Sequence, residues 1–132
     1  MDKFYRENIL DHFRNPHNFG KLARADFVSE IGNPSCGDKI KMQVQLANDN
    51  KQLTINNLKF TGEGCAISIA SASMLTDKIK DMSIEEIKKL GLEDILRLLG
   101  INLTPSRVRC ALLPLEVLHN TLTLAKAKKS TL

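Results

Sequence analysis

Apolar and polar positions in this chain of 132 residues change their spacing along the sequence, and each spacing predicts a different element. In the opening segment, apolar residues recur at helical intervals, which predicts a helix over about residues 3–14. Asn15-Pro16 ends this pattern, because a residue that precedes proline is disfavoured in the helical region. Residues 15–25 are therefore expected to form a loop, with Gly20 as its flexible point.

The clearest strand is expected over residues 39–46, where apolar and polar side chains alternate strictly. This alternation is the period of a half-buried strand. Residues 48–50 (Asn-Asp-Asn) supply turn chemistry, and the alternation then resumes but changes phase, so a β-bulge is expected near Asn56-Asn57. With a weaker strand over residues 27–31, these segments predict an antiparallel sheet of about three strands with one face on the core.

The second half of the chain has the pattern of helices. Residues 65–80 are rich in Ala, Ser, Ile, Met and Leu without a breaker, so a helix is expected to start at or just after Cys65. Ser83 and Glu86 form a capping box for a short helix that ends near Gly91, and another is expected over residues 92–99.

The last helix is expected to open at Thr104-Pro105 and to run past Cys110 toward Lys126. Pro114 lies inside it and should kink the helix or delay its true start. The chain shows no internal repeat, low-complexity tract or interdomain linker. We therefore expect one α+β domain over residues 1–132, in which a small antiparallel sheet of about three strands packs against helices.

Composition and charge narrow the classes of function. The length allows a core of ordinary size, so no disulfide or metal is needed merely for folding. The formal net charge is +4, but Lys and Arg are interleaved with acids as far as Glu116. With one Tyr and no Trp, the chain also offers few platforms for stacking bases, so we expect no nucleic-acid binding. A solvated surface, or basic patches that meet an acidic protein partner, explains the charge.

The expected compartment bears on the cysteines. The N-terminus lacks the apolar stretch of a secretion signal, and no run approaches the roughly 20 apolar residues that span a bilayer, so we expect a cytoplasmic protein with no membrane association. The chain has three cysteines, an odd number, and a cytosolic compartment keeps thiols reduced. Metal binding or thiol chemistry is therefore expected rather than a disulfide framework.

Each cysteine lies where a loop is expected to meet a regular element. Cys36 and Asp38 are two residues apart in a turn-rich segment, and Gly37 lets the backbone turn so that both side chains can point into one site. Cys65 follows a glycine-rich loop at an expected helix start, where free N–H groups and the helix dipole favour a thiolate. Taken alone, the first segment is explained equally well by a packed cysteine with a capping Asp. Taken alone, Cys65 is explained better as a small buried apolar residue than as a reactive thiolate.

The third cysteine, Cys110, lies near the start of the last helix beside Arg107 and Arg109, whose positive charge also favours a thiolate. Taken alone, it could be an ordinary core cysteine. Together, however, three thiolates and one carboxylate make four ligands, the number required by tetrahedral zinc or the edge of a two-iron cluster. One hard oxygen ligand among soft sulfurs suits a site that releases its cargo. His12 and His119 are expected to be surface or core histidines rather than ligands.

These residues resemble the family of iron–sulfur cluster scaffolds that comprises IscU, SufU and the N-terminal domain of NifU. The resemblance covers nearly the whole chain, in four segments in the family's order: residues 5–20, 33–38, 62–73 and 107–111. It implies the family's compact α+β fold, of the SufE/NifU-like kind. It also implies that the metal and cluster ligands are Cys36, Asp38, Cys65 and Cys110.

The activity implied by this resemblance is iron–sulfur cluster assembly. The protein would accept sulfur from a cysteine desulfurase, with Cys36 as the first candidate acceptor and Cys110 as the second. It would then hold a [2Fe-2S] cluster or iron transiently for transfer to recipient apoproteins, with zinc expected in the site as isolated. The alternatives are a zinc-dependent sulfurtransferase of the SufU type and a structural zinc module whose binding function lies on another surface.

Departures from the family patterns concern the subfamily. Arg109 stands where IscU-type members have a His that can serve as a ligand, and a guanidinium cannot coordinate a metal. Residues 103–107 replace the IscU motif Leu-Pro-Pro-Val-Lys. Both differences point toward SufU, but the SufU insertion between the second and third cysteines is missing, since Cys65 and Cys110 are only 45 positions apart. The chain lies between the two patterns.

Overall fold

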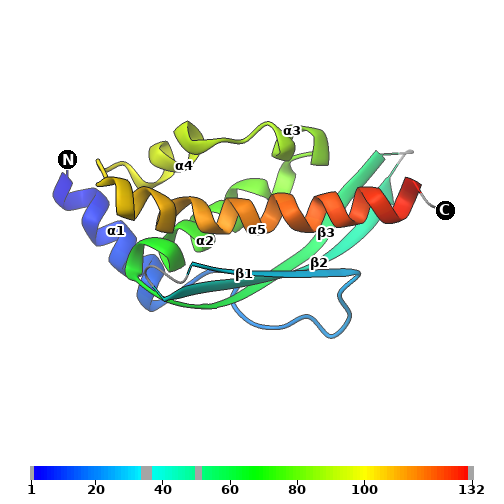
Figure 1. Ribbon diagram of the computed structural model, residues 1–132, viewed down its shortest axis with the longest axis horizontal. Coiled ribbons are helices and arrows are strands. Elements are labelled where there is room, and N and C mark those ends of the chain that lie inside the picture. Colours follow the sequence, from blue (N-terminus) through cyan, green and yellow to red (C-terminus); the bar gives the residue numbers. More distant parts are fainter. Residues whose placement is uncertain (1, 34–36, 50–51, 131–132) are drawn as a thin grey trace.

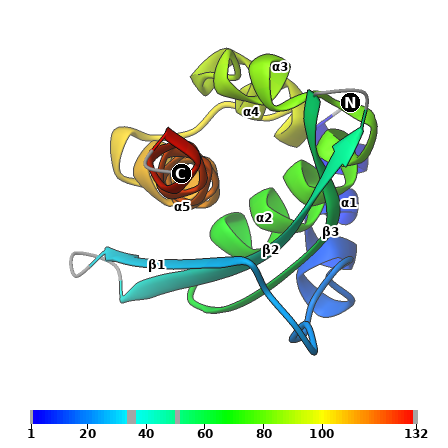
Figure 2. The ribbon, with the colours of Figure 1, turned by 90° about the vertical axis from the view of Figure 1, so that its right-hand side faces the viewer.

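The computed structural model describes residues 2–33, 37–49 and 52–130. In chain order, the elements are α1 (Asp2–Arg14), β1 (Phe27–Asn33), β2 (Asp38–Asp49), β3 (Gln52–Glu63), α2 (Ala66–Lys78), the 3-10 helix η1 (Ile79–Asp81), α3 (Ile84–Lys88), α4 (Leu92–Leu99) and α5 (Pro105–Ser130). The strands form an antiparallel sheet in the order β1-β2-β3. Helices α2 and α5 lie over one face of this sheet (Figures 1 and 2). The predicted α+β class with a three-stranded antiparallel sheet is confirmed.

Strand β2 lies at the centre of the sheet and carries much of the core. Ile40, Met42 and Val44 are fully buried beneath the helices, as the strict alternation predicted. Gln43, on the opposite face, is also buried, because the loop after α1 covers it and Leu22 donates a hydrogen bond from its backbone N–H to the Gln43 Oε1 atom (2.9 Å). The alternation therefore predicted the core face of β2, but it did not predict that the loop after α1 covers Gln43 on the opposite face.

The register between β2 and β3 shifts where the sequence predicted a bulge. Gln45 pairs with Asn57 and Leu46 with Ile55, so that Asn56 is left between them. The turn predicted over residues 48–50 is wrong for its first two positions, because β2 continues to Asp49; Asn50 lies outside the described residues. The strand predicted over residues 27–31 is confirmed and extends to Asn33.

The helix boundaries agree closely with their sequence signals. Helix α1 is found where it was predicted, and α2 begins at Ala66 with Cys65 as its N-cap residue. Both hydrogen bonds of the predicted capping box are present at the start of α3, between Ser83 and Glu86. Helix α4 ends at Gly100, which has a left-handed backbone (φ 71°).

Helix α5 starts at Pro105, as the Thr104-Pro105 signal predicted, and it continues through Pro114, so the proline does not delay its start. A proline removes one intrahelical N–H donor, so the carbonyls of the preceding turn need other partners. Ser71 on α2 donates a hydrogen bond from its hydroxyl to the backbone oxygen of Ala111 (2.7 Å). This contact from a neighbouring helix supports α5 at the turn that the proline weakens.

Candidate metal and sulfur site

Three of the four predicted ligands converge at one end of the sheet. The carboxylate of Asp38 and the sulfur atoms of Cys65 and Cys110 all lie within 4.8 Å of one another. Asp38 is the first residue of β2, Cys65 caps α2, and Cys110 lies in the second turn of α5. Within the described part of the chain, no other group of His, Cys, Asp or Glu side chains meets this criterion for holding a metal ion. Cys36, the fourth predicted ligand, lies outside the described residues.

The converging ligands differ in their access to solvent. Asp38 and Cys110 are each only 2% exposed, whereas Cys65 is partly exposed. Burying a carboxylate beside two thiols is costly unless hydrogen bonds or a cation compensate for the lost hydration. Two sulfurs and one carboxylate oxygen are ligands that zinc accepts, and cysteine sulfurs are the usual ligands of iron–sulfur clusters. The donor set therefore fits zinc, iron or a cluster.

The backbone at the start of α2 fixes the orientation of Asp38. The backbone N–H of Cys65 donates a hydrogen bond to Asp38 Oδ1 (2.9 Å), and the Cys65 sulfur lies 3.7 Å from Asp38 Oδ2. Cys65 has the extended backbone of an N-cap residue but makes no capping hydrogen bond with its own side chain. Asp38 therefore supplies an acceptor at the helix start that α2 lacks in its own sequence.

Hydroxyl groups of α2 form hydrogen bonds with the backbone at Cys65 and next to Cys110. Ser68 is fully buried; its hydroxyl donates to the backbone oxygen of Cys65 (3.0 Å) and lies 3.9 Å from the Cys65 sulfur. Ser71 ties α2 to α5 one residue after Cys110, through its bond to Ala111. The two thiols thus sit on helices that are joined directly beside the site.

The other residues singled out from the sequence are not among the three converging side chains. Arg107 and Arg109 are exposed on the first turns of α5. His12 hydrogen-bonds to Ser73 (Nδ1 to Oγ, 2.7 Å), and His119 to the backbone oxygen of Ile87 (3.0 Å). The histidines therefore form structural contacts at other positions of the fold.

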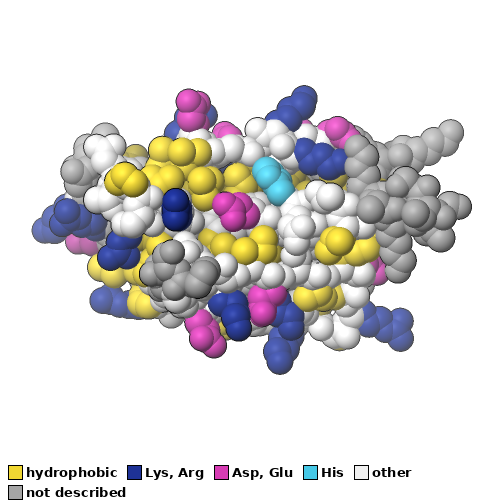
Figure 3. Space-filling view, in the orientation of Figure 1, with side chains coloured by type: hydrophobic (Ala, Val, Ile, Leu, Met, Phe, Trp, Pro, Cys, Tyr) yellow, Lys and Arg dark blue, Asp and Glu magenta, His cyan; other side chains and the backbone are white. Residues whose placement is uncertain are grey.

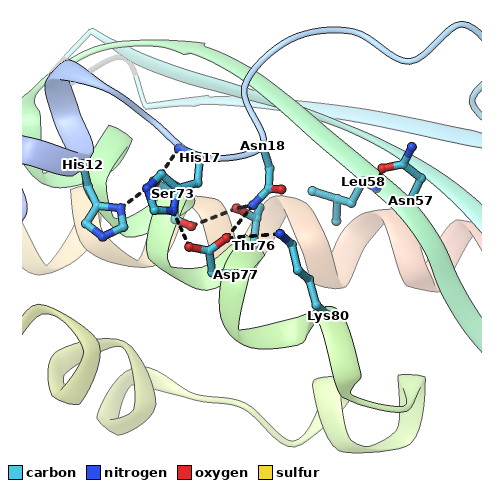
Figure 4. A network of polar contacts seen from close by, with 9 residues as sticks. All are labelled: His12, His17, Asn18, Asn57, Leu58, Ser73, Thr76, Asp77 and Lys80. Carbon is cyan, nitrogen blue, oxygen red and sulfur yellow. Dashed lines mark hydrogen bonds and ion pairs between the residues drawn. The ribbon is translucent and has the colours of Figure 1, made fainter.

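A polar network that the sequence did not predict attaches α1 and the following loop to α2 (Figure 4). The hydroxyl of Ser73 contacts His12 and accepts a hydrogen bond from the backbone N–H of His17 (2.8 Å). The His17 ring contacts Asp77, which also accepts a hydrogen bond from Asn18 Nδ2 (2.9 Å). The sequence predicts a helix stop at Asn15-Pro16, and the family resemblance includes Asn18, but neither assigns this segment an anchoring role.

Asn18 also secures the loop to the free edge of β3. It has a left-handed backbone (φ 59°), and its backbone oxygen accepts a hydrogen bond from Phe60 N–H (2.9 Å). Gly20 N–H donates in turn to the Phe60 oxygen (2.9 Å). The loop therefore covers part of an edge strand that would otherwise be open to pairing with another chain.

Two groups of the network have shifted pKa values. Burial and the neighbouring charge of His17 lower the pKa of His12, although nearby acids oppose this shift. Burial alone would raise the pKa of Asp77, but hydrogen bonds from His17 and Asn18 outweigh it and lower that pKa. The network is therefore most stable with His12 neutral and Asp77 ionised.

The face that carries α5 has mixed character. Figure 3 shows hydrophobic side chains along the first half of α5, with Lys, Arg, Asp and Glu around them. A groove of about 650 Å³ lies where α4, the loop after it and α5 meet, and its apolar lining comes from Leu96, Ile101, Leu103 and Val108.

Over the described residues, none of the helices combines the length and apolar character required to cross a bilayer.

The fold and the converging ligands define a small α+β protein with a buried sulfur- and oxygen-lined site that suits a metal or a cluster. A family comparison agrees with this class, because the NifU-like N terminal domain matches residues 4–131. The chain belongs to this family, and the resemblance proposed from the four sequence segments is confirmed.

The individual relatives include proteins named SufU and proteins named IscU. The zinc-dependent sulfurtransferase SufU of Bacillus subtilis (strain 168) is 36% identical over 90% of this chain and 89% of its own length. The iron–sulfur cluster assembly scaffold protein IscU of Aquifex aeolicus (strain VF5) is 39% identical over 87% of this chain and 71% of its own. A solved structure named FiSufU, of the SUF system of Fervidobacterium islandicum AW-1, has a TM-score of 0.75 and 28% identity over 88% of this chain and 94% of its own.

Proposed function

We propose that this chain is a scaffold of iron–sulfur cluster assembly, which accepts sulfur from a cysteine desulfurase, holds a [2Fe-2S] cluster transiently and passes it to recipient apoproteins. The observation that carries the proposal is the convergence of Asp38, Cys65 and Cys110 within 4.8 Å at a buried site. Relatives named as assembly scaffolds and as SufU support the same reading. Cys36 is proposed as the fourth ligand, since it is two residues from Asp38 and the chain between them spans only about 7 Å when extended.

Sulfur transfer requires an accessible thiolate on this chain. The thiolate attacks the outer sulfur of a persulfide on the desulfurase, so that a new S–S bond forms here while the old one breaks and the desulfurase cysteine leaves as a thiolate. Cys110 is only 2% exposed, so it can meet another protein only after the site opens. Cys36, whose sequence segment is turn-rich and includes Gly37, is proposed as the first acceptor and Cys110 as the second.

Anaerobic reconstitution with iron, a desulfurase and cysteine tests the scaffold function. The expected product is a coloured protein with visible absorbance that is lost in Cys36→Ala, Cys65→Ala and Cys110→Ala. Asp81→Ala is the matched control for a general charge effect, because Asp81 is an exposed acid remote in sequence from every ligand. A colourless product that still carries persulfide would exclude a scaffold.

A zinc-dependent sulfurtransferase is the second candidate, and the similarity to SufU over 90% of the chain favours it. A bound zinc would hold the cysteines as thiolates and take no part in redox chemistry. Under this alternative, stimulation of the desulfurase persists without iron, and mass spectrometry of trapped persulfide identifies the acceptor cysteine. Under the scaffold function, iron is required for the product.

A structural zinc module is the third candidate. Under this alternative, metal removal alone unfolds the protein, while the cysteine variants retain assembly activity. The core argues against it, because fully buried side chains from β2, β3, α2, α4 and α5 pack together independently of the ligands.

A further inference from the structure

The glycine that precedes Cys65 lies directly against the carboxylate of Asp38. A Cβ atom placed on Gly64 would be 3.0 Å from Asp38 Cα and 2.6 Å from Asp38 Cγ, and closer still to Oδ1. Such distances are shorter than carbon atoms tolerate, so a side chain at position 64 and the present position of the carboxylate exclude each other.

The space left by Gly64 is the space through which Asp38 reaches the start of α2. The carboxylate uses it to accept the N–H of Cys65 through Oδ1 (2.9 Å). That bond leaves the second oxygen, Oδ2, on the side of the Cys65 sulfur (3.7 Å). Because Asp38 is 2% exposed, it cannot swing into solvent without disturbing the surrounding core.

We infer that Gly64 is a positioning residue for the metal site: the missing side chain lets Asp38 cap α2 and thereby aims its second oxygen at the ligand cluster. This inference rests on the proposed function only in that Asp38 is taken as a ligand. A side chain at position 64 would force either the carboxylate or the Cys65 backbone to move, and each movement displaces a ligand.

A simpler explanation of Gly64 is its backbone alone, since its φ of +146° is one that other residues rarely adopt. The chain offers a matched control for this effect. Gly20 has a similar φ of +138°, but a Cβ placed there has no atom within 4 Å. Gly20→Ala therefore carries the backbone strain without the steric conflict, and only Gly64→Ala carries both.

The first experiment is a double-mutant cycle on the metal-free protein, measured as the thermal midpoint of unfolding. We expect Gly64→Ala to lower the midpoint by about 4 °C more than Gly20→Ala. In an Asp38→Ala background this excess should fall by at least half, because the carboxylate that opposes the new methyl group is gone. Equal shifts for the two glycine variants, or an excess that persists without Asp38, would overturn the inference.

The second experiment reads the site itself with cobalt(II), whose absorption spectrum depends on its ligands. Outer-shell changes commonly weaken metal binding 10–100-fold, so we expect Gly64→Ala to lose at least about tenfold in cobalt affinity and to give the ligand-field bands of Asp38→Ala. Gly20→Ala should match the wild type in both. A wild-type spectrum and affinity for Gly64→Ala would overturn the inference.

The two experiments separate failure of this inference from failure of the proposed function. If the wild-type protein shows no thiolate-to-cobalt absorption, the metal site is refuted, and the metal-free cycle still decides whether Gly64 holds Asp38 in place. If the wild type and Asp38→Ala give the same cobalt spectrum, Asp38 is not a ligand, and the positioning role of Gly64 is refuted with it.

Discussion

Replacing Ser73 by alanine should loosen the attachment of α1 to the rest of the protein. The Ser73 hydroxyl is fully buried and contacts both His12 Nδ1 (2.7 Å) and the backbone N–H of His17 (2.8 Å). Each hydrogen bond contributes a net of about 1 kcal/mol, so the two together predict a loss of about 2 kcal/mol. For a chain of this length, that corresponds to a decrease of about 8 °C in the unfolding midpoint.

Thermal unfolding combined with hydrogen exchange measures this effect and its location. Exchange should accelerate mainly over residues 2–20, because the lost bonds join that segment to α2. Thr121→Val is a suitable control: Thr121 is also fully buried, but its hydroxyl bonds only to the Val117 oxygen of its own helix (2.8 Å). A loss in Ser73→Ala no larger than in Thr121→Val, or exchange that rises uniformly, would show that the network does not hold α1.

Three further predictions concern stability. The free energy of unfolding should fall as pH decreases from 7.5 to 5. Burial and the charge of His17 lower the pKa of His12, so the unfolded chain takes up a proton at a higher pH than the folded one does. Denaturant titrations of His12→Gln should therefore show a flatter pH dependence than those of the wild type. A further loss in more acidic solution should come from Asp77, whose lowered pKa stabilises the fold only while it is ionised. Gly100→Ala should destabilise the protein by about 1–3 kcal/mol, because Gly100 has a φ of 71° and a Cβ there would lie 2.6 Å from Tyr5 Cγ. Tyr5→Ala should relieve part of that loss. If the losses of the two single variants simply add in the double variant, the contact is contradicted.

The sequence predicted those helices and strands whose defining residues are close together along the chain. Strict alternation predicted the core face of β2, and paired signals such as Ser83 with Glu86 predicted a helix start. Whether Pro114 would delay the start of α5 could not be predicted in this way. The turn before Pro114 accepts a hydrogen bond from Ser71, whose helix becomes a neighbour only in the folded protein.

The candidate site shows the same division between local and tertiary information. Cys65 could be singled out because it follows a loop at the start of a helix, and Cys110 because it lies near the start of another. The capping role of Asp38 at α2 could not, because it joins β2 to Cys65, the N-cap residue that lies 27 positions later in the sequence. Gly64 illustrates the difference: its sequence context indicates only a flexible loop, whereas its contact with Asp38 makes the absence of a side chain a steric requirement.

The arrangement of the proposed ligands bears on the choice between a scaffold and a structural zinc module. Asp38, Cys65 and Cys110 come from β2, α2 and α5, elements that already pack through a common hydrophobic core and through the Ser71 bond to Ala111. A metal that binds ligands already assembled in this way stabilises the fold by mass action alone, as any ligand of the native state does. It is not needed to bring those elements together, in contrast to a small zinc domain, where the metal supplies the folding energy. The fold can therefore persist when the metal or cluster leaves, which is the property that a scaffold needs in order to release its product and accept sulfur again.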